Sequence, residues 1–164
     1  MTGRLAAVAA FLAISCSPDN ALSGSLSAVF PLDISRTEIA ANGEALQVTY
    51  VYNHGVFVDV VARVSVGIPD IALKPGVKID LAGEIDGGVL RCTVSHAPGG
   101  EPVRQLPAIK RGDLTLDEGG TPGALTRGSF SMLFEDQGGD LGEGRDLTGH
   151  FLGTATDAGF GELP

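Results

Sequence analysis

The chain has 164 residues, a length that suits one domain with a hydrophobic core of its own. It carries 20 acidic and 11 basic residues, for a formal net charge of −9. This balance argues against nucleic-acid binding and against electrostatic docking on an anionic lipid surface, since both depend on basic side chains. The 24 glycines and nine prolines fall between short apolar runs, as is typical of turns between short β-strands.

The first feature in chain order is a short apolar segment. Residues 5–14 are uninterrupted by any polar side chain and follow Arg4. A run of ten is too short to span a membrane, which takes about 20 residues, but it has the length of the apolar region of a secretory signal. The small residue Ser15 and then Cys16 come directly after it. These features predict an exported protein.

The residues before the cysteine resemble the lipobox of bacterial lipoprotein signals, here Leu12-Ala13-Ile14-Ser15-Cys16. The resemblance covers only this segment. It implies that residues 1–15 are a signal peptide and that Cys16 carries the acyl chains that hold the protein on a membrane. Because Ser17 follows the cysteine, where lipoproteins kept in the inner membrane often have Asp, the expected location is the outer membrane or the cell surface of a bacterium. The alternative is an ordinary secretory signal, which would leave Cys16 free to pair with Cys92 in an oxidising compartment.

The polar residues that follow Cys16 predict a flexible tether over residues 16–24, and residues 25–164 are expected to form a single domain. In that domain apolar and polar residues alternate, which is the pattern of half-buried antiparallel strands. The expected strands cover residues 25–34, 46–52, 58–66, 77–81, 90–95, 114–116, 129–134 and 147–152. Glycine-containing turns separate these segments, among them Asn53-His54-Gly55 and Asp86-Gly87-Gly88. The pattern predicts an all-β fold, an antiparallel β-sandwich of about eight short strands, with a small closed β-barrel as the alternative.

No catalytic motif is recognisable in the sequence. The histidines His54, His96 and His150 lie too far apart in the chain to form a local metal pair. Cys92 shares the apolar face of its predicted strand with Leu90 and Val94, which favours a core thiol over a nucleophile. The sequence therefore gives no candidate catalytic residue and no candidate cofactor.

The acidic loop over residues 135–146 is the one candidate metal site. Calcium prefers six to eight oxygen ligands, and a flexible loop rich in Asp and Gly can supply them. The spacing fits neither an EF-hand nor a glycine-rich β-roll repeat, so a solvated hairpin loop is the competing interpretation. The carboxylates proposed as calcium ligands are Asp136, Asp140, Glu143 and Asp146.

These observations favour a non-enzymatic domain of the cell envelope or cell surface, with a binding or structural role. Its expected partners are the membrane, through the N-terminal lipid, and a protein or glycan of unknown identity, while nucleic acid is excluded. One alternative is an envelope hydrolase whose histidines and carboxylates come together only in the fold. Another is an adhesion-like module that calcium stabilises.

Overall fold

The computed structural model describes residues 19–67, 73–82, 91–97, 104–136 and 144–157. Within them ten strands form two five-stranded antiparallel sheets. Sheet A has the order β1 (Ala21–Ser23), β10 (Asp146–Thr154), β9 (Leu125–Phe134), β8 (Ile109–Glu118) and β5 (Lys78–Asp80). Sheet B has the order β2 (Arg36–Ala41), β3 (Ala45–His54), β4 (Phe57–Gly67), β6 (Arg91–Ala97) and β7 (Arg104–Gln105).

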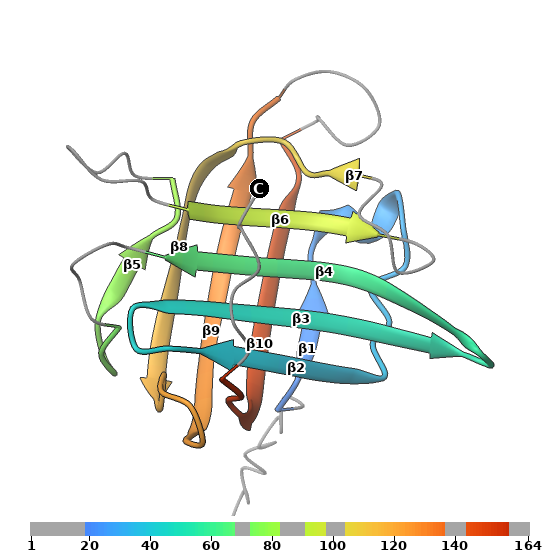
Figure 1. Cartoon of the computed structure of the whole chain (residues 1–164). Coiled ribbons are helices and arrows are strands. Elements are labelled where there is room, and N and C mark those ends of the chain that lie inside the picture. The colour runs from blue at the N-terminus through green and yellow to red at the C-terminus, as the bar shows by residue number, and fades with distance from the viewer. Residues whose placement is uncertain (1–18, 68–72, 83–90, 98–103, 137–143, 158–164) are drawn as a thin grey trace, which may run out of the picture.

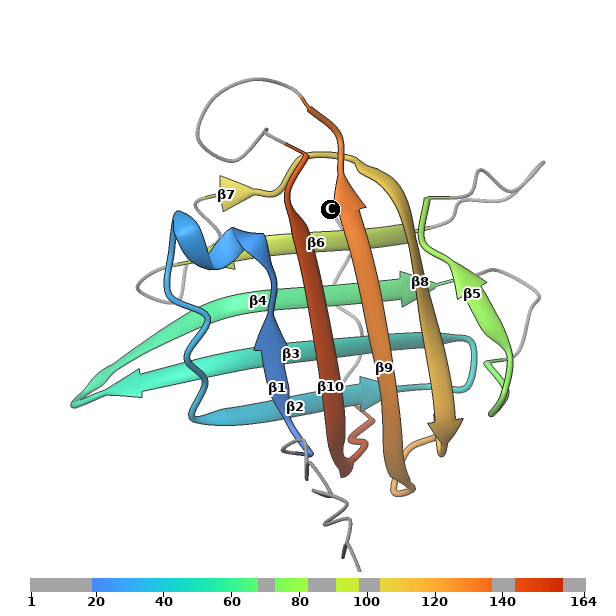
Figure 2. The same cartoon turned by 180° about the vertical axis from the view of Figure 1, so that it is seen from behind.

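The two sheets pack face to face, and the strands of one run across those of the other (Figures 1 and 2). The predicted all-β sandwich is therefore confirmed, and the closed barrel is not the fold. Ten strands are present in the described residues where about eight were expected, because β1, β2 and β7 were not predicted and the strand expected over residues 25–34 is absent.

The core lies between the sheets and is built from the inward faces of their long strands. Tyr50 of β3 is fully buried, and its ring meets Phe130 of β9 edge-on, with the ring centres 6.0 Å apart. The Tyr50 hydroxyl donates a 3.0 Å hydrogen bond to the carbonyl oxygen of His150 on β10. Burial raises the pKa of Tyr50 far above its ordinary value. A neutral phenol thus links sheet B to sheet A.

The N-terminal boundary of the fold lies earlier than the sequence suggested. The segment that was expected to be a flexible tether includes β1, whose residues Ala21 to Ser23 pair with β10. The Asn20 side chain continues this pairing, since its amide donates to the Leu152 carbonyl at 3.1 Å and accepts from the Leu152 amide at 2.9 Å. The part of the predicted tether from Asn20 onward therefore belongs to the sandwich.

The strand expected over residues 25–34 is wrong. Ser25–Ala28 form a 3₁₀ helix, η1, which an irregular segment follows up to β2. Leu26 and Phe30 are nevertheless buried, as expected. Leu26 lies in η1 and Phe30 lies beyond its end, so both reach the core without the backbone of a strand, and their spacing in the sequence does not show this.

Candidate functional site

The β3–β4 hairpin extends beyond the strands on either side of it. Its own pairing continues to His54 and Phe57, whereas β2 pairs with β3 only as far as Val51 and β6 pairs with β4 only as far as Val60. Residues 52–59 thus form a two-stranded projection, here called the arm, which leaves the sandwich at the right of Figure 1.

The turn at the end of the arm is a two-residue loop of Gly55 and Val56 between the paired residues His54 and Phe57. Gly55 has φ 65°, at the first of the two loop positions. The turns that suit the twist of a two-residue hairpin require a positive φ at this position, and glycine adopts it without strain. The turn that the sequence predicted at Asn53-His54-Gly55 is confirmed.

The arm carries four of the six large apolar side chains that are exposed among the described residues. Val56 is 90% exposed, Phe57 63%, Val58 40% and Tyr52 39%. Only two other large apolar side chains among the described residues are comparably exposed, Val77 and Leu125, and both belong to other segments of the chain. Single exposed apolar residues are ordinary, but four on one projection make the arm a candidate contact surface.

The alternation predicts that Tyr52 shares the face of Tyr50, which is correct, and that Val58 shares the inward face of Ala62, which is wrong, and both side chains are exposed. Sheet A does not cover the arm, so Tyr52 continues the inward face of β3 past the end of the core. On β4 the alternation is interrupted at Val61, which has no partner on β3, because Val60 pairs with Val51 and Ala62 with Tyr50. The extra residue of such a bulge shifts the alternation by one, so that residues before it point to the opposite face from the one that the pattern after it predicts. Val58 therefore does not share the inward face of Ala62.

Four side chains occupy one face of the arm. Tyr52 pairs directly with Asp59, and His54 with Phe57. The His54 ring stacks on Tyr52 with centres 5.8 Å apart and lies 5.9 Å from the ring of Phe57. Its Nε2 atom lies 2.8 Å from Asp59 Oδ2, with both side chains partly exposed. These contacts hold the three rings and the carboxylate together as a row that ends at the apolar tip.

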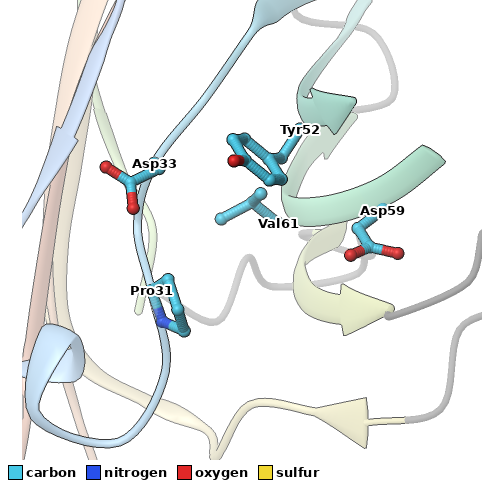
Figure 3. Close-up of a pocket in the computed structure, with 5 residues that line it drawn as sticks. All are labelled: Pro31, Asp33, Tyr52, Asp59 and Val61. Atoms are coloured by element: carbon cyan, nitrogen blue, oxygen red, sulfur yellow. The ribbon is translucent and has the colours of Figure 1, made fainter. Parts of the chain in front are cut away.

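A small pocket of about 210 Å³ lies where this face meets the segment before β2. In Figure 3, Tyr52 and Val61 project from the hairpin toward the segment that carries Pro31 and Asp33. The carboxylates of Asp33 and Asp59 lie on opposite sides of the pocket and do not converge on it. The pocket is smaller than a typical site for a drug-sized ligand, about 300–1,000 Å³.

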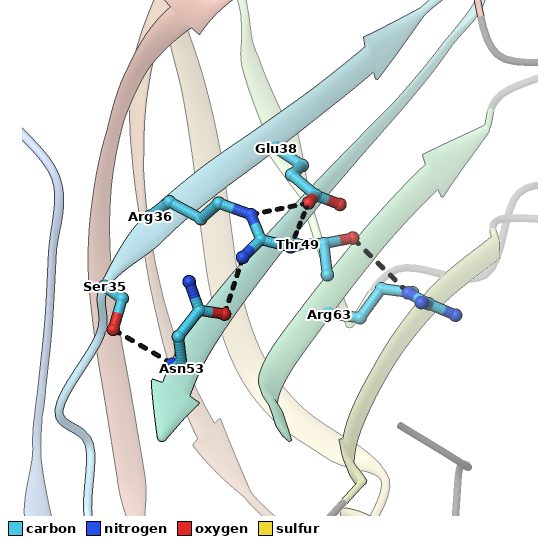
Figure 4. Close-up of polar contacts among 6 residues, drawn as sticks. All are labelled: Ser35, Arg36, Glu38, Thr49, Asn53 and Arg63. Atoms are coloured by element: carbon cyan, nitrogen blue, oxygen red, sulfur yellow. Dashed lines mark hydrogen bonds and ion pairs between the residues drawn. The ribbon is translucent and has the colours of Figure 1, made fainter. Parts of the chain in front are cut away.

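The opposite face of the arm is braced at its base by polar contacts (Figure 4). Arg36 of β2 donates from Nη1 to the Asn53 side chain at 2.6 Å and forms an ion pair with Glu38 at 2.8 Å. The backbone N–H of Asn53 donates to the Ser35 hydroxyl at 3.0 Å. On the same face of sheet B, Arg63 donates to Thr49 at 3.4 Å. Through Asn53, these contacts join the base of the arm to β2 and to the residue before it.

The structure does not bring the proposed calcium ligands together as a described site. Asp140 and Glu143 lie outside the described residues, and Asp136 follows the end of β9. The Asp146 carboxylate, at the start of β10, instead accepts hydrogen bonds from the hydroxyl and the amide of Ser25 at 2.5 and 3.3 Å. In the part of the chain that the structure describes, no group of three or more His, Cys, Asp or Glu side chains is arranged to hold a metal.

The other candidate residues are separate from the arm or undescribed. Cys16 lies outside the described residues, and for Cys92 and His96 only the backbone is described, on β6. His150 is exposed on β10. Of the histidine side chains that the structure describes, His54 is the one placed against a carboxylate. None of the described residues forms a helix long and apolar enough to cross a membrane.

The Ser25 contact to Asp146 makes one prediction about acid stability. The Ser25 hydroxyl holds the pKa of Asp146 below its ordinary value of about 3.9. The contact therefore stabilises the fold above pH 4, and this stabilisation disappears as the pH falls through the lowered pKa. Asp146→Asn should flatten the fall in Tm between about pH 5 and pH 2. Ser25→Ala removes the hydroxyl donor and should flatten the fall in Tm similarly. If Tm falls with pH in both variants as steeply as in wild type, the Ser25–Asp146 contact is not a source of acid sensitivity.

No protein-family model, curated protein or solved structure matches the chain. The alternation of apolar and polar residues did not predict that the arm is exposed, although the sequence contains one indication of it. Val56, Phe57 and Val58 follow a turn as three consecutive apolar residues, and adjacent residues of a strand cannot all point into the same core.

Proposed function

We propose that the protein is a lipid-anchored, non-enzymatic domain of the bacterial envelope that uses the β3–β4 arm as its contact surface. The observation that carries this proposal is that four of the six exposed large apolar side chains of the described residues, Tyr52, Val56, Phe57 and Val58, lie on one projection. A folded domain gains nothing in stability from apolar side chains left in water, so they serve a contact made outside the chain.

The anchor part of the proposal rests on the apolar run of residues 5–14 and on Cys16. A chain acylated two or three times stays on a membrane, whereas a single acyl chain binds only marginally. The folded residues begin shortly after Cys16, with Asn20 fixed to Leu152. The lipid would therefore hold the sandwich close to the bilayer.

The experiment that tests the anchor compares wild type with Cys16→Ser by intact mass and by fractionation of the producing cells. We expect wild type to start at Cys16, to be heavier by two or three acyl groups, and to be recovered entirely with membranes. The variant should lack the acyl mass and either retain residues 1–15 or be released. An unmodified, soluble wild-type chain would contradict the anchor, and a disulfide between Cys16 and Cys92 should then be sought.

A second candidate function is hydrolysis, favoured by the 2.8 Å contact between His54 and Asp59. In Ser-His-Asp hydrolases a carboxylate also orients the histidine, but it does so at Nδ1, whereas Asp59 contacts Nε2 of His54. The described contacts of His54 are with Tyr52, Phe57 and Asp59, and its side chain is about half exposed, so it lies in water and not in an enclosed site. Hydrolysis of p-nitrophenyl acetate that disappears in His54→Gln would favour this candidate over the binding domain.

A further inference from the structure

The tip of the arm has the composition of a surface that enters apolar surroundings. Residues 53–58 contain no Asp, Glu, Lys or Arg, in a chain with 31 such residues elsewhere. The only charged side chain of the arm, Asp59, lies at its base and is paired with His54. Val56 and Phe57 are the two most exposed large apolar residues described; Val56 lies in the turn of the hairpin and Phe57 is the first paired residue after it. The tip can therefore leave water without burying a charge that lacks a partner.

The rest of the chain indicates what the tip would enter. Four peptide steps separate Cys16 from Asn20, and an extended chain spans at most about 3.6 Å per residue. A lipid on Cys16 would thus hold the start of β1 within about 15 Å of the membrane. In Figures 1 and 2, β1 starts near the lower edge of the molecule, whereas the arm projects mainly to one side and bends toward that edge. A membrane surface inclined to the strands of sheet A, on the side between these two points, would meet both the anchored end and the arm.

We propose that the arm inserts its tip, Val56 and Phe57, into the interfacial layer of the membrane that holds the N-terminal lipid. The inference rests on the proposed anchor and adds a second, protein-mediated contact to it. Tyr52 and His54 lie behind the tip at the depth of the lipid head groups, where amphipathic rings are favoured. Together the lipid and the arm fix the orientation of the sandwich, since two points of attachment restrict rotation about the tether.

The charge of the chain specifies the lipid that favours insertion. With a net charge of −9, the protein is repelled by an anionic surface, so insertion depends on apolar burial alone. Insertion should be stronger in zwitterionic phosphatidylcholine than in a bilayer rich in phosphatidylglycerol. Added salt should reduce this difference, because it screens the repulsion.

The test uses a single tryptophan, which the wild-type chain lacks. Full-length, lipidated Phe57→Trp is reconstituted in phosphatidylcholine vesicles with and without brominated acyl chains, which quench tryptophan on contact. We expect at least a twofold loss of fluorescence and a blue-shifted emission. Matched variants Leu125→Trp and Val77→Trp place the reporter at the other two exposed apolar sites and should keep the emission of a residue in water.

Equal quenching in the three variants, or no quenching in Phe57→Trp, would overturn the insertion. A blue-shifted emission from Phe57→Trp that brominated lipid does not quench would also overturn it, because the tip would then be covered by protein, either a second copy or a partner. Vesicle flotation and intact mass distinguish a failure of the insertion proposal from a failure of the proposed lipid anchor. A Phe57→Trp chain that carries its lipid and floats while its fluorescence stays unquenched contradicts insertion alone. A chain without acyl mass contradicts the anchor on which the insertion rests.

Discussion

Replacing Gly149 with alanine is expected to destabilise the protein by about 3 kcal/mol, at the upper end of what overpacking a core costs. Gly149 lies on β10 directly opposite Phe130 of β9. A Cβ atom at this position would overlap the edge of the Phe130 ring and lie 3.0 Å from the Tyr50 hydroxyl. Neither ring can move aside, since Phe130 and Tyr50 are both buried and pack against each other.

The matched control is Gly153→Ala on the same strand. The nearest atom to a Cβ there is the terminal carbon of Ile39 at 3.3 Å, the flexible end of a side chain. We expect a change below about 1 kcal/mol, of either sign. Urea unfolding of the two variants and wild type measures the difference directly. Equal unfolding free energies for the two alanine variants would contradict the prediction, because they would show that a Cβ atom at Gly149 can be accommodated beside Phe130 and Tyr50.

Where a strand buries one face against the other sheet, its alternation was sufficient for prediction. The β9 residues Phe130, Met132 and Phe134 are buried while Ser131 is exposed, as their spacing predicted. The same holds for Leu114 and Leu116 of β8. One buried face leaves a period of two in the sequence, and these segments have it.

The edge strand β2 could not be predicted in this way, because its last three residues are all buried. The cause is a contact that is distant in sequence. Residues near Thr156 lie along the outer edge of β2, where the Ala41 amide donates to the Thr156 carbonyl at 3.1 Å and the Thr156 amide to the Ile39 carbonyl at 2.9 Å. Because consecutive residues of β2 are buried, the strand shows no period of two. The sequence of β2 itself does not indicate that a distant segment covers it.

The arm was predicted as strand and turn but not as a site. Whether Tyr52 lies in a core or in water depends on how far sheet A reaches, which is a property of the assembled sandwich. The bulge at Val61 could not be predicted either. One unpaired residue changes which side chains face inward, but it leaves the apolar composition of the strand unchanged. The proposed anchor is the opposite case. It depends on a short contiguous motif, so sequence alone was enough to suggest it.

The second large effect is expected for Phe130→Ala, and its comparison with Phe57→Ala separates the core from the contact surface. Both variants remove the same ring from a strand of a hairpin. Phe130 is 2% exposed between the sheets, so its loss should leave a cavity and cost about 3–5 kcal/mol. Phe57 is mostly in water in the isolated chain, and its loss should cost less than about 1 kcal/mol.

Denaturant unfolding of the two full-length variants in the same detergent would measure these costs. A loss for Phe57→Ala as large as that for Phe130→Ala would mean that the arm is part of the folding core, and the contact-surface proposal would then fail. With the expected result, a Phe57 variant keeps its fold, so any loss of membrane contact in that variant can be assigned to the side chain itself. The small cost of removing the ring would then agree with a role in a contact outside the chain and not in the core of the sandwich.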